Sequence, residues 1–182
     1  GAITTIANWR GYGSITYDGV FYGQKAHALR ELITLPTRSE ERFQLALAID
    51  PAEVNDLARL SANGWHLVDP VDACGTPDRY QQFFPATKAE FGVAKSGYVA
   101  SRCGWFSDRS VCYLASGRPV LAQDTGFDRV LPTGRGLFTF RTVEDVLPAL
   151  AAMNDDYPRH AASARGLAEE HFDSNRVLSR LL

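Results

Sequence analysis

The chain has 182 residues, of which 45% are hydrophobic, and its 21 acidic residues against 19 lysines and arginines give a formal net charge of −2. This length and composition are typical of one globular domain with a proper core. Because the charges nearly cancel and no basic run is present, the sequence lacks the signature of a nucleic-acid or membrane-surface partner. A small molecule is therefore the expected partner.

The cysteines are odd in number and lack metal-ligand spacing: Cys74, Cys103 and Cys112. This indicates a reducing compartment rather than a disulfide framework, so we expect a cytoplasmic location and no metal site. No run of about eighteen apolar residues suits a bilayer span, and the opening GAITTIANW lacks the basic region of a signal peptide. The abrupt start inside a strand pattern suggests a piece of a longer protein.

Apolar runs and amphipathic segments alternate along the chain. Compact apolar runs predict strands over 3–9, 43–49, 65–68, 90–95 and 119–123. Helical spacing, with Pro and Gly as boundaries, predicts helices over 19–35, 51–64, 80–89, 107–117, 144–153, 159–172 and 175–182, and the stretch 70–79 is predicted as a loop. We therefore expect an α/β fold over residues 1–182, a single Rossmann-like three-layer domain whose parallel sheet is flanked by helices.

The stretch 103–126, CGWFSDRSVCYLASGRPVLAQDTG, contains the start of a helix with Ser107 as the N-cap candidate. A helix start carries free backbone N–H groups and a partial positive charge, so it favours an anion such as a phosphate. Gly104 would let the backbone approach a ligand closely, and Ser107 and Ser110 offer hydroxyl donors.

Two arginines, Arg102 and Arg109, flank this helix start and would supply charge-assisted donors suited to a diphosphate. The alternative is structural. Ser107 would then only cap the helix, Trp105 would belong to the core, and both arginines would be solvated.

The order of residues in this stretch resembles that of a known family. CGW-x-S, followed by SGRPV and then D-T-G, looks like the donor-binding signature of the two-domain glycosyltransferases of the GT-B fold. It is similar to the C-G-W-N-S start of the plant secondary-product signature, and ASGRPVLAQDTGF resembles the A-x-G-x-P-V-I-A-x-x-x-G-G segment of the family 4 enzymes. The resemblance covers most of the chain and is specific between Lys95 and Phe127.

The resemblance implies that the chain is the C-terminal half of such an enzyme, with Trp105 in its donor-binding signature. This half would bind a nucleotide diphosphate sugar as a substrate, with no resident cofactor. An N-terminal acceptor domain of the same protein would be its partner, and the acceptor stays open.

The chain departs from the family pattern at the expected carboxylates. Family 4 enzymes carry two glutamates across this segment, and the corresponding positions here are Gly104 and Cys112. Asp108 is the nearby carboxylate, and one hypothesis is that it takes over ribose binding. The other is that it only interacts with the helix dipole in the first turn.

Further donor-site candidates follow the other strands. Arg10, Gly11 and Gly13 come after the first strand, where the resemblance implies a glycine loop and a cation near the phosphates; a plain turn is the alternative. Lys25 is the candidate companion cation, although a helical lysine is usually solvated. Lys95 ends the fourth strand and is expected to point into the same crevice.

Asp124, Thr125 and Gly126 end the fifth strand, and the resemblance implies that this corner meets the donor sugar or phosphate. The alternative is a simple Asx-turn. No catalytic or metal role is assigned to the scattered histidines His27, His66, His160 and His171.

The sequence thus predicts the donor-binding half of a GT-B glycosyltransferase, which stabilises the leaving diphosphate electrostatically. Two alternatives stay open. A sugar-nucleotide epimerase or phosphorylase-like relative would use the same fold, but an epimerase usually needs acidic residues beyond Asp108 and Asp124. A non-catalytic nucleotide-binding module is favoured by the missing glutamates.

Overall fold

The computed structural model describes residues 1–11 and 13–179. Its strands are β1 (Ile3–Asn8), β2 (Ile15–Tyr17), β3 (Val20–Tyr22), β4 (Phe43–Ala48), β5 (His66–Val68), β6 (Ala89–Gly92), β7 (Val120–Gln123) and β8 (Leu137–Phe140). Its α-helices are α1 (Lys25–Glu31), α2 (Val54–Ala62), α3 (Pro70–Cys74), α4 (Pro77–Phe83), α5 (Ser96–Ser101), α6 (Asp108–Ala115), α7 (Val143–Asp155), α8 (Tyr157–His171) and α9 (Ser174–Leu178). Short 3-10 turns occupy Leu35–Arg38 and Phe127–Arg129.

Six strands form one parallel sheet in the order β5-β4-β1-β6-β7-β8. The chain builds outward from β1 in one direction, then returns and builds outward in the other. The strand order therefore reverses between β1 and β6, and at such a point the helices that follow the two strands diverge and leave a crevice. This confirms the predicted α/β, Rossmann-like fold.

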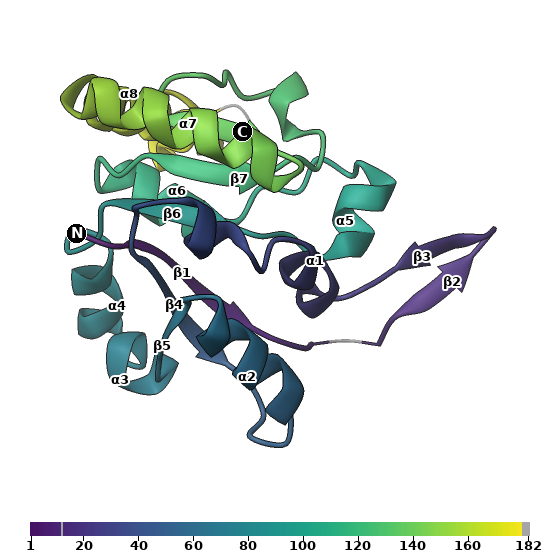
Figure 1. Cartoon of the computed structure of the whole chain (residues 1–182). Helices are drawn as coiled ribbons and strands as arrows, with labels where there is room; N and C mark the ends of the chain where they lie inside the picture. The colour runs from purple at the N-terminus through teal and green to yellow at the C-terminus, as the bar shows by residue number, and fades with distance from the viewer. Residues whose placement is uncertain (12, 180–182) are drawn as a thin grey trace.

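Helices cover both faces of the sheet, which gives three layers (Figure 1). Alternate residues of the strands enter two separate cores, because successive side chains of a strand point to opposite faces. The core on one face joins Phe91 of β6 to α1, α2 and α7. The core on the other face joins Ala122 of β7 to α3, α4, α6 and α8. The next residue back from Phe91, Glu90, consequently faces the layer that contains α6.

The predicted loop over 70–79 is wrong, because two short helices occupy it. Pro70 and Pro77 each take the first helical position, where the missing N–H costs nothing. Asp69 and Thr76 cap these helices through their side chains, which accept backbone hydrogen bonds. The second helix, α4, ends at Phe83, before Pro85.

The predicted helix over 19–35 is also wrong in its first part. Residues 15–22 form the β2–β3 hairpin, which extends away from the rest of the domain (Figure 1). Asp18 and Gly19 turn the chain with φ of 49° and 75°, the left-handed values that a tight two-residue hairpin turn requires. The helix α1 begins only at Lys25, so this lysine lies at a helix start rather than along a helix face.

Smaller differences concern element boundaries. β6 ends at Gly92, so Lys95 lies beyond the strand as the N-cap residue of α5, a helix that the sequence analysis did not predict. The strand β8 was not predicted either. The helix after Pro51 begins at Val54. The last predicted helix corresponds to α9, and its residues 180–182 lie outside the described part of the chain.

None of the helices in the described part of the chain has the length and apolar character that a bilayer span requires.

Candidate functional site

Two neighbouring cavities open at the carboxyl edge of the sheet, next to the ends of β1 and β6. The first, of about 310 Å³, is bordered by Tyr98, Trp105 and Phe106, and we call it the aromatic cavity. The second, of about 570 Å³, is bordered by Asn8, Arg10, Gly11 and Gln24, and we call it the polar cavity. Both lie at the point of the sheet where the topology predicts a ligand crevice.

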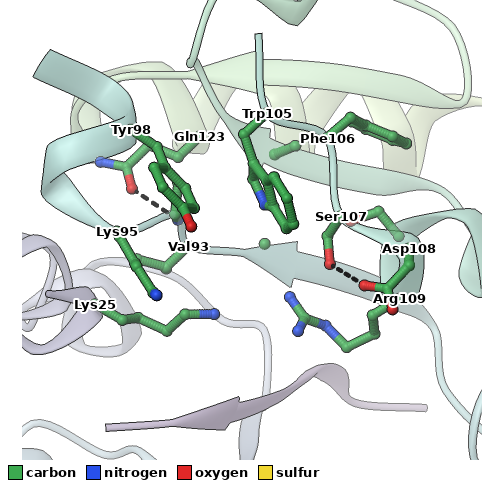
Figure 2. A pocket seen from close by; sticks show the side chains of 14 residues that line it. Lys25, Val93, Lys95, Tyr98, Trp105, Phe106, Ser107, Asp108, Arg109 and Gln123 are labelled. Carbon is green, nitrogen blue, oxygen red and sulfur yellow. Dashed lines mark hydrogen bonds between the residues drawn. The ribbon is translucent and has the colours of Figure 1, made fainter. Parts of the chain in front are cut away.

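Three cationic side chains form the wall that the two cavities share. Lys25, Lys95 and Arg109 line both cavities. Figure 2 shows the two amino groups and the guanidinium pointing toward a common space below the ring of Trp105. The cations come from three elements: Lys25 begins α1, Lys95 precedes α5, and Arg109 lies in the first turn of α6. Charges of one sign that converge in this way make a region of strong positive potential.

Arg109 is fixed by a buried ion pair. Its Nε donates to Oε1 of Glu90 at 2.9 Å, and the Glu90 side chain is 0% exposed. Burial opposes the charge of Arg109, but the attraction of Glu90 and their hydrogen bond hold the pKa of the guanidinium above its ordinary value. Arg109 is therefore charged at all physiological pH values and held in one place.

Lys25, unlike Arg109, has a pKa below its ordinary value. Burial lowers the pKa of Lys25 to about 7, and the positive charges of Arg109 and Lys95 act in the same direction, against the attraction of Glu90. Lys25 makes no hydrogen bond or ion pair with any of the described residues. Its charge therefore depends on pH near neutrality and on any anion that enters the cleft.

The start of α6 lies at the rim of the aromatic cavity. Ser107 is the N-cap residue, as predicted, but its hydroxyl donates to Oδ1 of Asp108 at 3.3 Å instead of capping the helix. Within the described residues, the backbone N–H groups of residues 108–110 donate to no acceptor. These amides and the exposed carboxylate of Asp108 border the cavity together with Ser110. The helix start is thus available to an anion.

Trp105 and Tyr98 form an aromatic surface in this cavity. Their ring centroids are 5.2 Å apart with an interplanar angle of 37°, and Trp105 is 46% exposed. The Nζ of Lys95 lies 5.4 Å from the centroid of Tyr98. This exposure contradicts the alternative that Trp105 belongs to the core, and its role in ligand binding stays a prediction. Such rings offer a flat surface on which a planar ring system can stack.

The structure places the predicted corner Asp124–Gly126 outside both cavities. Asp124 is 4% exposed, and its carboxylate accepts hydrogen bonds from the Gly126 amide, from Arg102 and from Arg141. The bond from the Gly126 amide makes an Asx-turn, which was the alternative prediction for this corner. Burial would raise the pKa of Asp124, but these partners together hold it below its ordinary value. Arg102 likewise points to this carboxylate and not into the cavities.

The glycine loop after β1 is held by Gln24. The amide of Gly11 donates to Oε1 of Gln24 at 3.1 Å, and Nε2 of Gln24 donates to the carbonyl oxygen of Gly13 at 2.7 Å. Gly11 lines the polar cavity and Gly13 does not. Arg10 lines the same cavity while it forms an ion pair with Glu53. The loop thus presents a backbone surface to the cleft.

Sequence reasoning missed four residues that shape the site. Glu90 fixes Arg109, Gln24 holds the glycine loop, Tyr98 pairs with Trp105, and Gln123 lines the aromatic cavity. A lone glutamate in the apolar run AEFGV was a signal for Glu90, because a buried carboxylate needs a cationic partner. No local pattern distinguished the other three residues.

Within residues 1–11 and 13–179, no group of three or more His, Cys, Asp or Glu side chains could hold a metal ion. No protein-family model matches the chain, and no curated protein sequence matches it either.

Proposed function

We propose that this domain binds the diphosphate of a nucleotide sugar and serves as the donor-binding half of a GT-B glycosyltransferase. The observation that carries the proposal is the shared cationic wall of Lys25, Lys95 and Arg109 between two cavities at the carboxyl edge of the sheet. In a nucleotide sugar, the diphosphate carries two negative charges and lies between the nucleoside and the sugar. The cleft has the matching order of cavity, cations and cavity.

The start of α6 adds to this match. Its free amides and the guanidinium of Arg109 lie on the same rim, so phosphate oxygens at the wall could accept from both. The stacked surface of Trp105 and Tyr98 suits a nucleobase, which is planar and aromatic.

The proposed role in catalysis is electrostatic. When the bond between the sugar and the diphosphate oxygen breaks, negative charge develops on the departing diphosphate. Fixed cations and amides around that oxygen stabilise the charge without having to reorganise. The acceptor site and any general base would lie on the other half of the enzyme, so this domain alone would bind the donor and turn it over poorly.

Isothermal titration calorimetry tests the proposal. UDP, GDP, ADP and dTDP, each free and as its glucose conjugate, are titrated into the protein at pH 6, where Lys25 is protonated. We expect at least one pair to bind, and Arg109→Met to abolish that binding. Arg59→Gln removes an exposed cation of α2 that lines neither cavity, and it should leave the affinity unchanged. Absence of binding by all four glucose conjugates would contradict the proposal.

A non-catalytic nucleotide-binding module is the second candidate. It is favoured because Asp108 is the one carboxylate among the described residues that line the two cavities. A product assay with the bound sugar nucleotide, in the presence of the expected N-terminal acceptor domain, decides between the enzyme and the module. Sugar transfer or hydrolysis supports the enzyme. Binding without any turnover supports the module.

A further inference from the structure

Glu90 combines two features that the fold alone does not require. Its side chain is completely buried in the layer between β6 and α6, and its Oε1 accepts from Arg109. Its other oxygen, Oε2, is buried and has no hydrogen-bond partner among the described residues. Placing a carboxylate in a protein interior is costly, and an unpartnered buried oxygen adds to that cost. A structural ion pair would normally satisfy both oxygens.

The charges around Glu90 explain what its carboxylate does. Lys25, Lys95 and Arg109 converge on the wall that both cavities share, and the carboxylate of Glu90 is the negative charge buried behind that wall. Two further charged side chains border the cavities. Arg10, which is paired with Glu53, borders the polar cavity, and the exposed carboxylate of Asp108 borders the aromatic cavity. Glu90 thus offsets one of three converging positive charges.

The charge of Lys25 changes near neutral pH, because its pKa is lowered to about 7. Arg109 and Lys95 repel its ammonium, and Glu90 attracts it. A diphosphate at the shared wall would add two negative charges and favour the protonated amine. Binding would then bring one proton from solvent to the Nζ of Lys25, to the extent that the amine was neutral beforehand.

We propose that Glu90 is a positioning residue of the anion site, which fixes Arg109 at the shared wall and keeps Lys25 able to take up a proton when a diphosphate binds. This inference rests on the proposed function, because it takes the anion to be a diphosphate. It predicts that donor affinity depends on pH through Lys25, with Glu90 setting the pH at which affinity declines.

The experiment uses the glucose conjugates of UDP, GDP, ADP and dTDP, whose diphosphate diesters do not titrate between pH 6 and 9. Calorimetry from pH 6 to 9, in buffers of different ionisation enthalpy, gives the affinity and the number of protons taken up. For the wild type we expect a loss of about tenfold per pH unit above pH 7 and uptake approaching one proton. Lys25→Arg keeps its charge over the whole range, so its affinity should not change with pH.

Glu90→Gln keeps the side-chain shape and removes the charge. We expect the pH at which affinity begins to fall to move below that of the wild type, because Lys25 loses its attractive neighbour. Glu90→Asp keeps the charge but shortens the reach to Arg109, so it should weaken binding at every pH without moving that point. If Glu90→Gln does not fold, Glu90→Asp still tests the positioning of Arg109: unchanged affinity in this variant would overturn that role.

The outcomes separate the two proposals. If none of the four conjugates binds at pH 6, the proposed function fails. If one binds with the same affinity from pH 6 to 9 and without proton uptake, the proposed function stands and the role of Lys25 fails. If Glu90→Gln weakens binding by the same factor at every pH, Glu90 acts through Arg109 alone and its proposed effect on Lys25 fails.

Discussion

The hydroxyl of Thr125 donates a hydrogen bond of 2.5 Å to the carbonyl oxygen of Trp105, which joins the end of β7 to the loop in front of α6. The carbonyl oxygen of Thr125 in turn accepts from the amide of Gly104 at 2.8 Å. Thr125 is completely buried. The position of the Trp105 ring, and with it one side of the aromatic cavity, therefore depends on a residue that lines neither cavity.

Replacing Thr125 by valine removes this hydroxyl at nearly constant shape. We expect the free energy of unfolding to fall by about 1 kcal/mol, as for a typical side-chain hydrogen bond. Donor affinity should fall several-fold, because Trp105 loses its anchor. Urea denaturation and calorimetry measure the two effects. Thr37→Val is the matched control, since the Thr37 hydroxyl bonds only within its own turn at the Thr34 carbonyl oxygen. Equal losses of donor affinity in both variants would contradict this role of Thr125.

Arg109→Met leaves the Glu90 carboxylate buried without its cation. We expect a loss of about 3–5 kcal/mol in the free energy of unfolding, because breaking a buried pair strands a charge. The double variant Arg109→Met, Glu90→Leu removes both charges and should recover most of that loss. Neither variant should bind the donor. Urea denaturation at pH 7 checks the order of stabilities, and a single variant as stable as the wild type would show that the pair is not desolvated as described.

The lowered pKa of Lys25 predicts how the free energy of unfolding depends on pH above neutrality. Its pKa is about 7 in the folded state against 10.5 in the unfolded chain, so the unfolded chain binds more protons between these values. Stability should therefore rise with pH from 7 to 9, by at most about 1.4 kcal/mol per pH unit from this group. Lys25→Met lacks this pH-dependent contribution, so its free energy of unfolding should exceed that of the wild type most at pH 7 and below. A stability difference between the two proteins that stays constant from pH 6 to 9 would rule out the lowered pKa.

The lowered pKa of Asp124 predicts how the free energy of unfolding depends on pH in acid. Its folded-state pKa is lowered, so its carboxylate stabilises the folded protein above the unfolded value of 3.8, and this contribution is lost as pH falls through the folded-state pKa. Asp124→Asn should be less stable by about 1.5–3 kcal/mol at pH 7, because it weakens the bonds to Arg102 and Arg141. The difference should vanish in strong acid. Asp155→Asn, at an exposed position, is the control and should match the wild type at pH 7.

Asp108→Asn decides between the two hypotheses for this carboxylate. If Asp108 binds the ribose, the variant should lose affinity several-fold for nucleoside diphosphates but not for inorganic pyrophosphate. If Asp108 only interacts with the dipole of α6, the variant should instead lose about 0.3–1 kcal/mol of stability, with both affinities unchanged. Calorimetry with the two ligands and a urea denaturation curve separate these results. We expect the first, because the carboxylate borders the aromatic cavity.

Much of the fold was predictable, because the strands bury short apolar runs and the helices carry their own signals. The segment of α6 illustrates this point: Ser107 begins the helix, and Gly117 ends it with a φ of 65°. The β2–β3 hairpin was missed although Asp18-Gly19 is a strong turn signal. The helical spacing of the apolar residues that follow led the predicted helix to start too early. β8 is short, and only its pairing with β7 identifies it.

The site was predictable only in part. The sequence by itself determined the start of α6 and the presence of Arg109, since both follow from local order. It also supplied Lys25, Lys95 and Arg10 as candidates, without deciding which of them meet. A cation in sequence has the same local pattern whether it is solvated, paired or aimed at a ligand.

The tertiary structure determines which of these cations lie close together. The reversal of strand order between β1 and β6 brings the start of α1 beside the start of α6, and so Lys25 beside Arg109. The same packing buried Glu90 behind them and turned Arg102 toward Asp124. Local sequence fixes backbone conformation through short-range sterics and hydrogen bonds. The charge of Lys25 depends on burial and on neighbours far along the chain, which exist only once the sheet has formed.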